Sequence, residues 1–266
     1  MRTQNEPKFC ATTKVLRKAS SPELRFQLSD HNNHPLPPFS RYSFSHSTFP
    51  QESSSHSLDP QCFRPSIAVM AGAQPAVKVV ALCGSLRKNS TNRGLIRAAI
   101  EIAKESIDGM EIEYVDISPL PMLNTDLEVD GTYPPAVEAF RRKILEAESV
   151  LFASPEYNYS VTAPLKNALD WASRPPNVWG NKAAAIVSSS GGSGGARSQY
   201  HLRQIGVFLD LHFINKPEFF LNAYQPPPKF DSHGDLIDRQ VREKLKAVLL
   251  ALHAFSLRLR GTSVVN

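Results

Sequence analysis

One polar segment of the chain carries the residue types that hold a phosphate group. Residues 84–92 (GSLRKNSTN) follow the apolar run 77–83 directly and are rich in hydroxyls, amides and positive charge. A strand that ends in such a loop before a helix makes an anion site, because free backbone N–H groups and the positive helix end converge there. An arginine fork can also bond two phosphate oxygens. The expected phosphate donors are Ser85, Arg87, Ser90 and Asn92.

Two further polar segments, 154–158 (SPEYN) and 188–195 (SSSGGSGG), also follow apolar runs. Pro155 stiffens the first of them, and Tyr157 offers a flat face beside backbone amides, which suits the edge or face of an aromatic ring. The glycines of the second permit close approach of a ligand to the backbone. Each segment alone could be an ordinary turn or a flexible connector. Three of them on adjacent strand ends indicate a site for a nucleotide cofactor.

Other reactive residue types do not form a recognisable catalytic or metal pattern. Cys83 ends an apolar run without a nearby histidine in the sequence, which favours a buried packing thiol over a nucleophile. The histidines show neither zinc-ligand spacing nor a triad order. We therefore expect no metal and no side-chain catalyst.

The segments that must position these loops alternate between strand and helix from Val77 onward. Apolar runs predict strands, and apolar residues at helical spacing predict helices. The expected strands are 77–83, 110–116, 149–153, 182–187 and 211–213, with a continuation of the last one past Pro217 into 218–221 left open. The expected helices are 91–106, 135–148, 164–173, 196–209 and 238–257.

Strands that alternate with helices predict an α/β domain with a parallel sheet covered on both faces. The polar segments follow strands one, three and four, which fits the flavodoxin-like doubly wound five-stranded order 2-1-3-4-5 and its ligand site at the carboxyl ends of the strands. A dinucleotide-binding fold is disfavoured, because the G-x-G-x-x-G fingerprint is absent after strand one. The Gly-Lys-Ser/Thr of a triphosphate-binding loop is absent as well.

The chain has 266 residues, of which 41% are hydrophobic and 21% charged, as in a globular protein with a core. Residues 1–75 differ, since serine and proline dominate them, and we expect this extension to be disordered. It is either a transit peptide or an extension upstream of a start at Met70. The domain is expected over 76–261, with a tail at 262–266.

The expected location is the cytoplasm, or the chloroplast if residues 1–69 act as a transit peptide. The three cysteines are scattered, which indicates a reducing compartment. The sequence has no apolar run that approaches the roughly 20 residues of a membrane span. A net charge of +5 without a basic stripe interleaved with aromatics gives little reason to expect nucleic acid as a partner.

Together these motifs resemble the NAD(P)H-dependent FMN reductase family and, within it, the plant NAD(P)H:quinone oxidoreductases. The resemblance covers about 76–261 and rests on four stretches, GSLRKNSTN (84–92), SPEYN (154–158), APLKNALDWASRP (163–175) and GGARSQYHLRQ (194–204). One departure is Thr162-Ala163-Pro164, where the family often has Pro-Gly before the helix.

The resemblance implies FMN at the sheet edge, with its phosphate on the four donors already named. It also implies that a second set of residues lies along the ribityl chain and the isoalloxazine ring, namely Pro155, Glu156, Tyr157 and Asn158. A third set would approach the edge of the ring, namely Ser189, Ser190, Gly191 and Gly192. NADPH or NADH would pass hydride to flavin N5, and a quinone would then take two electrons in a ping-pong cycle.

A dimer or tetramer is also implied by the resemblance. Within the same class, reduction of free flavin, azo dyes or chromate is the alternative. From another class, a flavodoxin-like electron carrier is the alternative, although the net positive charge argues against it.

Overall fold

The computed structural model describes residues 75–261. The extension expected over 1–75, apart from Pro75 itself, and the tail at 262–266 lie outside the described residues. In chain order the elements are β1 (Val77–Cys83), α1 (Thr91–Ser106), β2 (Met110–Tyr114), η1 (Thr125–Leu127), α2 (Pro135–Glu146), β3 (Ser149–Ala153), α3 (Ala163–Ser173), β4 (Lys182–Ser190), α4 (Ala196–Leu209), β5 (Leu211–Phe213), β6 (Phe220–Asn222) and α5 (Arg239–Arg260).

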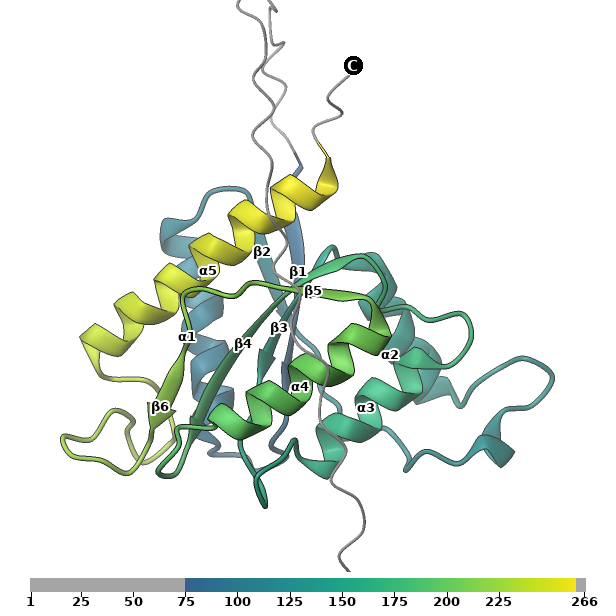
Figure 1. Ribbon diagram of the computed structural model, residues 1–266, viewed down its shortest axis with the longest axis horizontal. Coiled ribbons are helices and arrows are strands. Elements are labelled where there is room, and N and C mark those ends of the chain that lie inside the picture. Colours follow the sequence, from purple (N-terminus) through teal and green to yellow (C-terminus); the bar gives the residue numbers. More distant parts are fainter. Residues whose placement is uncertain (1–74, 262–266) are drawn as a thin grey trace, which may run out of the picture. The chain divides into compact units, whose positions relative to one another are not determined.

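The strands form one parallel sheet in the order β2-β1-β3-β4-β5, with β6 also paired to β4 (Figure 1). The predicted flavodoxin-like order is therefore confirmed. The order reverses between β1 and β3, so their connections run to opposite sides and leave a crevice at the carboxyl ends of these strands.

The outer position of the sheet is shared by two short strands. β5 pairs with the start of β4 at Lys182–Ala184, and β6 pairs with its end at Ser188–Ser190. The continuation past Pro217 thus exists as a separate strand that begins at Phe220. The sequence pattern predicts an end of the fourth strand at Val187, and this boundary is wrong because β4 continues to Ser190. The chain around β6 supplies backbone partners to two of these serines, since the Ser188 amide donates to the Phe219 carbonyl and the Ala223 amide donates to the Ser190 carbonyl.

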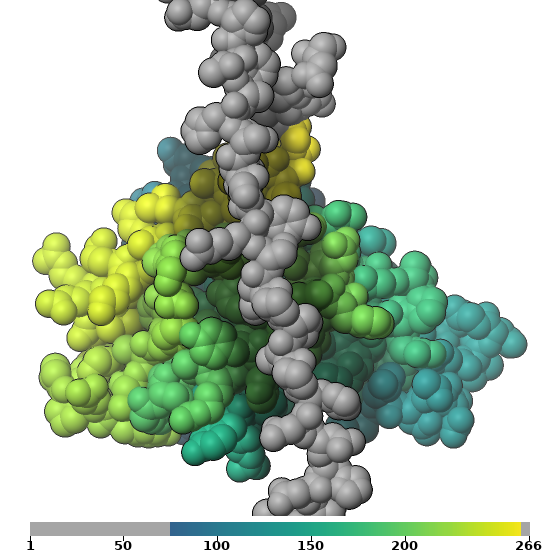
Figure 2. All heavy atoms as spheres, in the orientation of Figure 1, coloured from purple at the N-terminus to yellow at the C-terminus, as the bar shows by residue number. Residues whose placement is uncertain are grey.

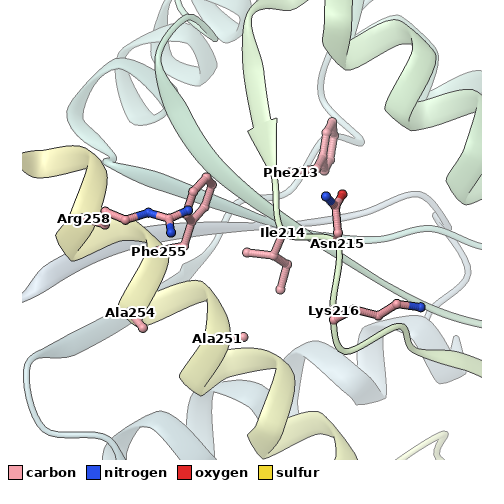
Figure 3. Close-up of a pocket in the computed structure, with 8 residues that line it drawn as sticks. All are labelled: Phe213, Ile214, Asn215, Lys216, Ala251, Ala254, Phe255 and Arg258. Carbon is pink, nitrogen blue, oxygen red and sulfur yellow. The ribbon is translucent and has the colours of Figure 1, made fainter. Parts of the chain in front are cut away.

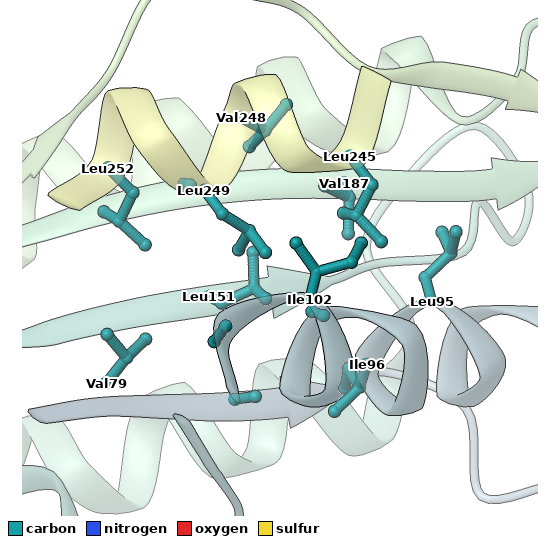
Figure 4. Packing of buried hydrophobic residues seen from close by; sticks show 14 of the residues in the cluster. Val79, Leu95, Ile96, Ile102, Leu151, Val187, Leu245, Val248, Leu249 and Leu252 are labelled. Atoms are coloured by element: carbon teal, nitrogen blue, oxygen red, sulfur yellow. The ribbon is translucent and has the colours of Figure 1, made fainter. Parts of the chain in front are cut away.

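Helices cover both faces of the sheet. Alternate strand residues point to opposite faces, so Val79, Ala81 and Leu151 pack with α1 and α5, whereas Val80 and Leu82 pack beneath α2, α3 and α4. Figure 4 shows the first of these layers, where leucines and valines of α5 meet α1 across β1, β3 and β4. The two layers bury both faces of the strands that lead to the edge where the polar loops lie.

Most predicted element boundaries agree with the structure, and β1, α1, β3 and α4 agree at both ends. β2 ends at Tyr114 and not at residue 116, α2 ends at Glu146, and α5 runs from Arg239 to Arg260. No helix among residues 75–261 is both long enough and apolar enough to span a membrane.

Two long connections leave the helical layers. Residues 118–134 project to the right in Figures 1 and 2 and include the short helix η1. Residues 223–238 form the lime-coloured lobe at the lower left of Figure 2, between β6 and α5. The second connection matters for the site, because it returns to the start of α1.

Candidate functional site

The three polar segments meet at the carboxyl edge of the sheet. We call residues 84–90 the first loop, residues 154–162 the second loop and residues 191–195 the third loop. They follow β1, β3 and β4, which are neighbours in the sheet. All twelve residues predicted from the sequence therefore lie on one edge. Their side chains, however, face different partners.

The first loop leaves its helix amides free. Ser90 caps α1 with extended backbone, and its side chain makes no capping hydrogen bond. The first-turn N–H groups of α1 thus remain available to an anion. Ser85 is buried, and its hydroxyl accepts a hydrogen bond from the Arg87 amide at 3.3 Å. Within the described residues the Arg87 guanidinium is exposed and makes no hydrogen bond or ion pair.

Asn92 joins the start of α1 to the end of β4. Its Nδ2 donates to the carbonyl of Ser189 at 2.6 Å, and its Oδ1 accepts from the amide of Ser189 at 2.9 Å. Both residues are buried, at 2% and 3% exposure. Both ends of the Asn92 side-chain amide therefore bond to the protein backbone. These bonds hold the first loop against β4.

The second loop contains a two-residue turn with unusual backbone geometry. Tyr157 and Ser160 exchange two backbone hydrogen bonds of 3.0 and 3.1 Å, and the residues between them, Asn158 and Tyr159, have φ values of 49° and 66°. Positive φ at both central positions is the geometry of a type I′ turn. A tyrosine rarely adopts it, and such outliers persist only where surrounding contacts hold them.

Glu156 turns away from its own loop toward α4. Its carboxylate accepts hydrogen bonds from the Ser193 hydroxyl at 2.8 Å, the Arg197 amide at 3.0 Å and the Arg197 guanidinium at 3.0 Å. The Arg197 guanidinium also lies 4.0 Å from the centroid of the Tyr159 ring. Burial acts to raise the pKa of the Glu156 carboxyl, but these hydrogen bonds outweigh it and hold that pKa below its usual range. The carboxylate thus links the second and third loops in its charged form.

Two more contacts tie the second loop to its neighbours. The Thr162 hydroxyl donates to the carbonyl of Gly84 at 2.5 Å, which joins the second loop to the first. A Cβ on Gly84 would lie 3.1 Å from Pro155 Cδ, so the two loops also pack closely. Below them, the hydroxyls of Ser154 and Ser198 lie 2.7 Å apart. The three loops are therefore cross-linked to one another by their own side chains.

The third loop combines a tight part with an open part. Gly194 and Gly195 have φ values of 62° and 91°, and a Cβ on Gly195 would lie 2.6 Å from Ser188 Cβ. Only glycine fits there. In contrast, a Cβ on Gly191 or Gly192 would meet nothing within 4 Å. The third loop therefore has a fixed base and an uncovered backbone tip.

A hollow of about 510 Å³ lies between the second and third loops. Its lining residues are Glu156, Asn158, Tyr159, Ser190, Gly191, Gly192, Ser193 and Arg197. At the preceding position of β4, the buried hydroxyl of Ser189 has no hydrogen-bond partner within the described residues. A buried polar atom without a partner and an uncovered glycine backbone are both features of a site built for a ligand.

The connection after β6 closes the outer side of the first loop. Gly234, with φ of 78°, packs on the carbonyl of Asn89, and a Cβ on Gly94 would lie only 1.8 Å from the Gly234 carbonyl oxygen. Arg97 pairs with Asp235 in the same turn. This wall of the site was not predicted, because nothing local in residues 231–235 indicates contact with α1.

The remaining candidates add no group to the hollow between the second and third loops. Cys83 is buried as expected, and burial raises the pKa of its thiol. Among residues 75–261, no cluster of three or more histidine, cysteine or acidic side chains could hold a metal ion. Figure 3 shows another hollow, of about 370 Å³, between α5 and the segment after β5, where Arg258 covers the ring of Phe255. It lies beside the strand that pairs with the start of β4, at the opposite end of the sheet from the loops.

Local sequence patterns indicate the three loops but not the contacts between them. They point to no role for Thr162, Arg197 or Tyr159. The threonine could have been noticed as a helix cap, since it precedes a helix that has Pro164 in its first turn, and it does accept from the Leu165 amide. Its second bond, to Gly84, spans 78 residues and has no local signal.

The sequence profile of the NADPH-dependent FMN reductase family matches residues 77–226. The chain belongs to this family. That span contains all three loops and the cross-linking side chains Asn92, Glu156 and Thr162.

Individual relatives agree with this membership. An NAD(P)H:quinone oxidoreductase of Solanum tuberosum is 75% identical over 189 residues, which are 71% of this chain and 97% of that protein. An NADPH:quinone oxidoreductase of Arabidopsis thaliana is 72% identical over 188 residues, 71% of this chain and 96% of that protein. Among solved structures, the flavoenzyme FerB of Paracoccus denitrificans, an NAD(P)H:(acceptor) oxidoreductase, is 28% identical with a TM-score of 0.61. That match covers 69% of this chain and 98% of FerB.

Proposed function

We propose that this member of the FMN reductase family is an FMN-dependent NAD(P)H:quinone oxidoreductase. The observation that carries the proposal is the set of three cross-linked loops at the carboxyl edge of the sheet, found in a chain that is 75% identical to a plant NAD(P)H:quinone oxidoreductase. The plant relatives of 72% and 75% identity bear the name of the quinone reaction, which favours it over reduction of azo dyes or chromate.

The residues present fit FMN. The free amides at the start of α1 and the uncommitted Arg87 suit a phosphate dianion. Ser85 and Ser90 line the same loop. The uncovered backbone at Gly191 and Gly192 suits the close approach of a flat ring. The unpartnered hydroxyl of Ser189 offers one further hydrogen bond to the cofactor.

The side chains divide into those that contact the cofactor and those that position the loops. Arg87, Ser85, Ser90, Ser189, Ser190 and the backbone of Pro155–Asn158 are proposed contacts. Asn92 and the carboxylate of Glu156 act through the loops they hold. When bound, FMN supplies the hydride chemistry of the reaction. The chain binds and orients it, and backbone N–H groups of the second and third loops stabilise charge at the ring edge.

Turnover tests the proposed function. The purified protein with FMN should oxidise NADPH or NADH when a small quinone is present, with parallel double-reciprocal plots, because donor and acceptor use the hollow in turn. The matched sample without quinone should oxidise the nucleotide only slowly. A protein that holds FMN but gives no quinone-dependent turnover would instead favour an electron carrier that meets a protein partner.

The Arg87→Ala substitution should weaken FMN binding by one to two decades. One charge-assisted hydrogen bond contributes about 1.5–3 kcal/mol, and every 1.4 kcal/mol is tenfold in affinity. Quenching of FMN fluorescence during titration of the apoprotein measures this change. Arg258→Ala is the matched control, since Arg258 also lacks an ion pair within the described residues but lies at the opposite end of the sheet. If the Arg87→Ala variant bound FMN with wild-type affinity, the phosphate would have to bind outside the first loop.

The exposed end of α4 is the proposed contact of a homo-oligomer, either a dimer or a tetramer. Val207 and Phe208 are 82% and 87% exposed, although both are large apolar residues. Adjacent apolar side chains left in solvent are typical of a surface that a partner covers.

The double substitution Val207→Ser, Phe208→Ser should therefore lower the molar mass measured by light scattering to that of a smaller assembly. Leu145→Ser is the control, because Leu145 is 63% exposed on α2 and lies in the other half of the same helical layer. An unchanged mass for the double variant would place the contact elsewhere.

A further inference from the structure

One ion pair sits in the wall of the hollow between the second and third loops. Glu156 and Arg197 lie 3.0 Å apart, and their side chains are 8% and 47% exposed. Among the described residues that line this hollow, these two are the only ones with a formal charge. The electrostatic potential inside the hollow therefore depends on how this single pair is balanced.

The pair is held in place from several sides. Ser193 and the Arg197 amide fix one carboxylate oxygen, and the guanidinium meets the other. The ring of Tyr159 lies under the guanidinium at 4.0 Å, on a backbone with φ of 66°. A bulky residue at positive φ is unfavourable unless its contacts hold it. The turn therefore presents the ring to Arg197 at the cost of a strained backbone.

Each charge of such a pair shifts the reduction potential of a nearby redox cofactor in a known direction. Reduction adds negative charge to the flavin ring, so a nearby carboxylate opposes it and a nearby guanidinium favours it. Burial strengthens such an effect, so the charge of Glu156, at 8% exposure, is screened less than that of Arg197, at 47%. The two charges offset one another while the pair stays complete. Removal of one partner leaves the other uncompensated.

We propose that Glu156 and Arg197 form a charge-balanced pair that sets the reduction potential of the cofactor in this hollow, and that Tyr159 keeps the pair closed. Glu156, Arg197 and Tyr159 are positioning residues in this role. The inference rests on the proposed function, because it takes FMN as the occupant. It goes beyond that function by assigning a residue set that tunes the cofactor.

Spectroelectrochemical titration of the FMN-loaded protein tests the proposal with three variants. Glu156→Gln should raise the midpoint potential, because it leaves the guanidinium uncompensated. Arg197→Gln should lower it, because it leaves the carboxylate uncompensated. The double variant should return toward the wild-type value. Arg258→Gln, which removes a guanidinium at the opposite end of the sheet, should leave the potential unchanged.

The decisive result is that the midpoint potential shifts in opposite directions in Glu156→Gln and Arg197→Gln. A purely structural role would weaken the loops in both single variants, and their potentials would then move in the same direction or not at all; either pattern overturns the proposal. FMN affinity from fluorescence titration of each apoprotein is the second measurement. It separates loss of the cofactor from a change in its potential.

Tyr159 is tested in the same way. Tyr159→Phe keeps the ring and should leave the potential unchanged, whereas Tyr159→Leu frees the guanidinium and should shift the potential in the direction of Arg197→Gln by a smaller amount. The proposed function fails separately from this inference. A protein that binds no FMN overturns both, and a protein that reduces quinones with FMN but lacks the opposite shifts overturns the inference alone.

Discussion

Replacement of Asn92 by alanine is expected to lower the free energy of unfolding by about 2–6 kcal/mol. The substitution removes two hydrogen bonds and leaves the N–H and C=O of Ser189 buried without partners. Each buried backbone group that loses its partner costs about 1–3 kcal/mol. Urea denaturation of the apoprotein, followed by circular dichroism, measures the change. FMN affinity should fall as well, because the first loop is then no longer held against β4.

Asn89→Ala is the matched control for this substitution. Asn89 lies in the same loop, is exposed, and makes one hydrogen bond of 3.4 Å to Ser232. Its replacement should change stability by less than about 0.5 kcal/mol, as for most surface positions. Asn92→Asp gives a further check, since a carboxylate oxygen would face the Ser189 carbonyl and should destabilise the protein at least as much as alanine does. A loss below about 1 kcal/mol for Asn92→Ala would contradict the role assigned to this side chain.

Replacement of Gly94 by alanine is expected to destabilise the protein by about 1–3 kcal/mol, the usual cost of overpacking. The new Cβ would lie 1.8 Å from the carbonyl oxygen of Gly234, which is a backbone atom in a turn packed on the first loop. Helix propensity predicts the opposite sign, since alanine is better than glycine inside a helix by about 1 kcal/mol. The thermal midpoint of the apoprotein decides between the two effects.

Gly191→Ala separates steric packing from cofactor binding. A Cβ at Gly191 meets nothing within 4 Å, so the apoprotein should keep its wild-type thermal midpoint. On the proposed function the added methyl would occupy space beside the ring and lower FMN affinity. Gly94→Ala should instead act mainly on the apoprotein and lower its stability. A Gly94 variant as stable as the wild type would mean that the 231–235 turn is not fixed against α1.

The edge at which the three polar loops meet followed from local patterns in the chain. Apolar runs such as Val77–Cys83 and Ser149–Ala153 form strands because they are buried on both faces of a parallel sheet, and that burial leaves a continuous signature in the sequence. The helical spacing of Thr91–Ser106 is equally local. These elements, taken in order, were sufficient to predict the sheet order and to put the three loops on one edge.

The end of β4 shows where local patterns stop being informative. Ser188–Ser190 resemble the start of a flexible glycine loop, yet they form strand because β6 pairs with them. Their partner lies about thirty residues away, beyond a proline-containing connection. β propensity depends on the neighbouring strand more than on the residue itself, so no property of three serines could have predicted this.

The sequence alone determined the family resemblance, the strand and helix order, and the three polar loops that meet at one edge of the sheet, because each depends on patterns within some twenty residues. Only the tertiary structure decided what the side chains of those loops do. Asn92 bonds to a residue 97 positions away and Glu156 to one 41 positions away, so both serve to join loops. A polar side chain has many possible partners in a chain, and which one it bonds is settled only when packed strands bring their ends together.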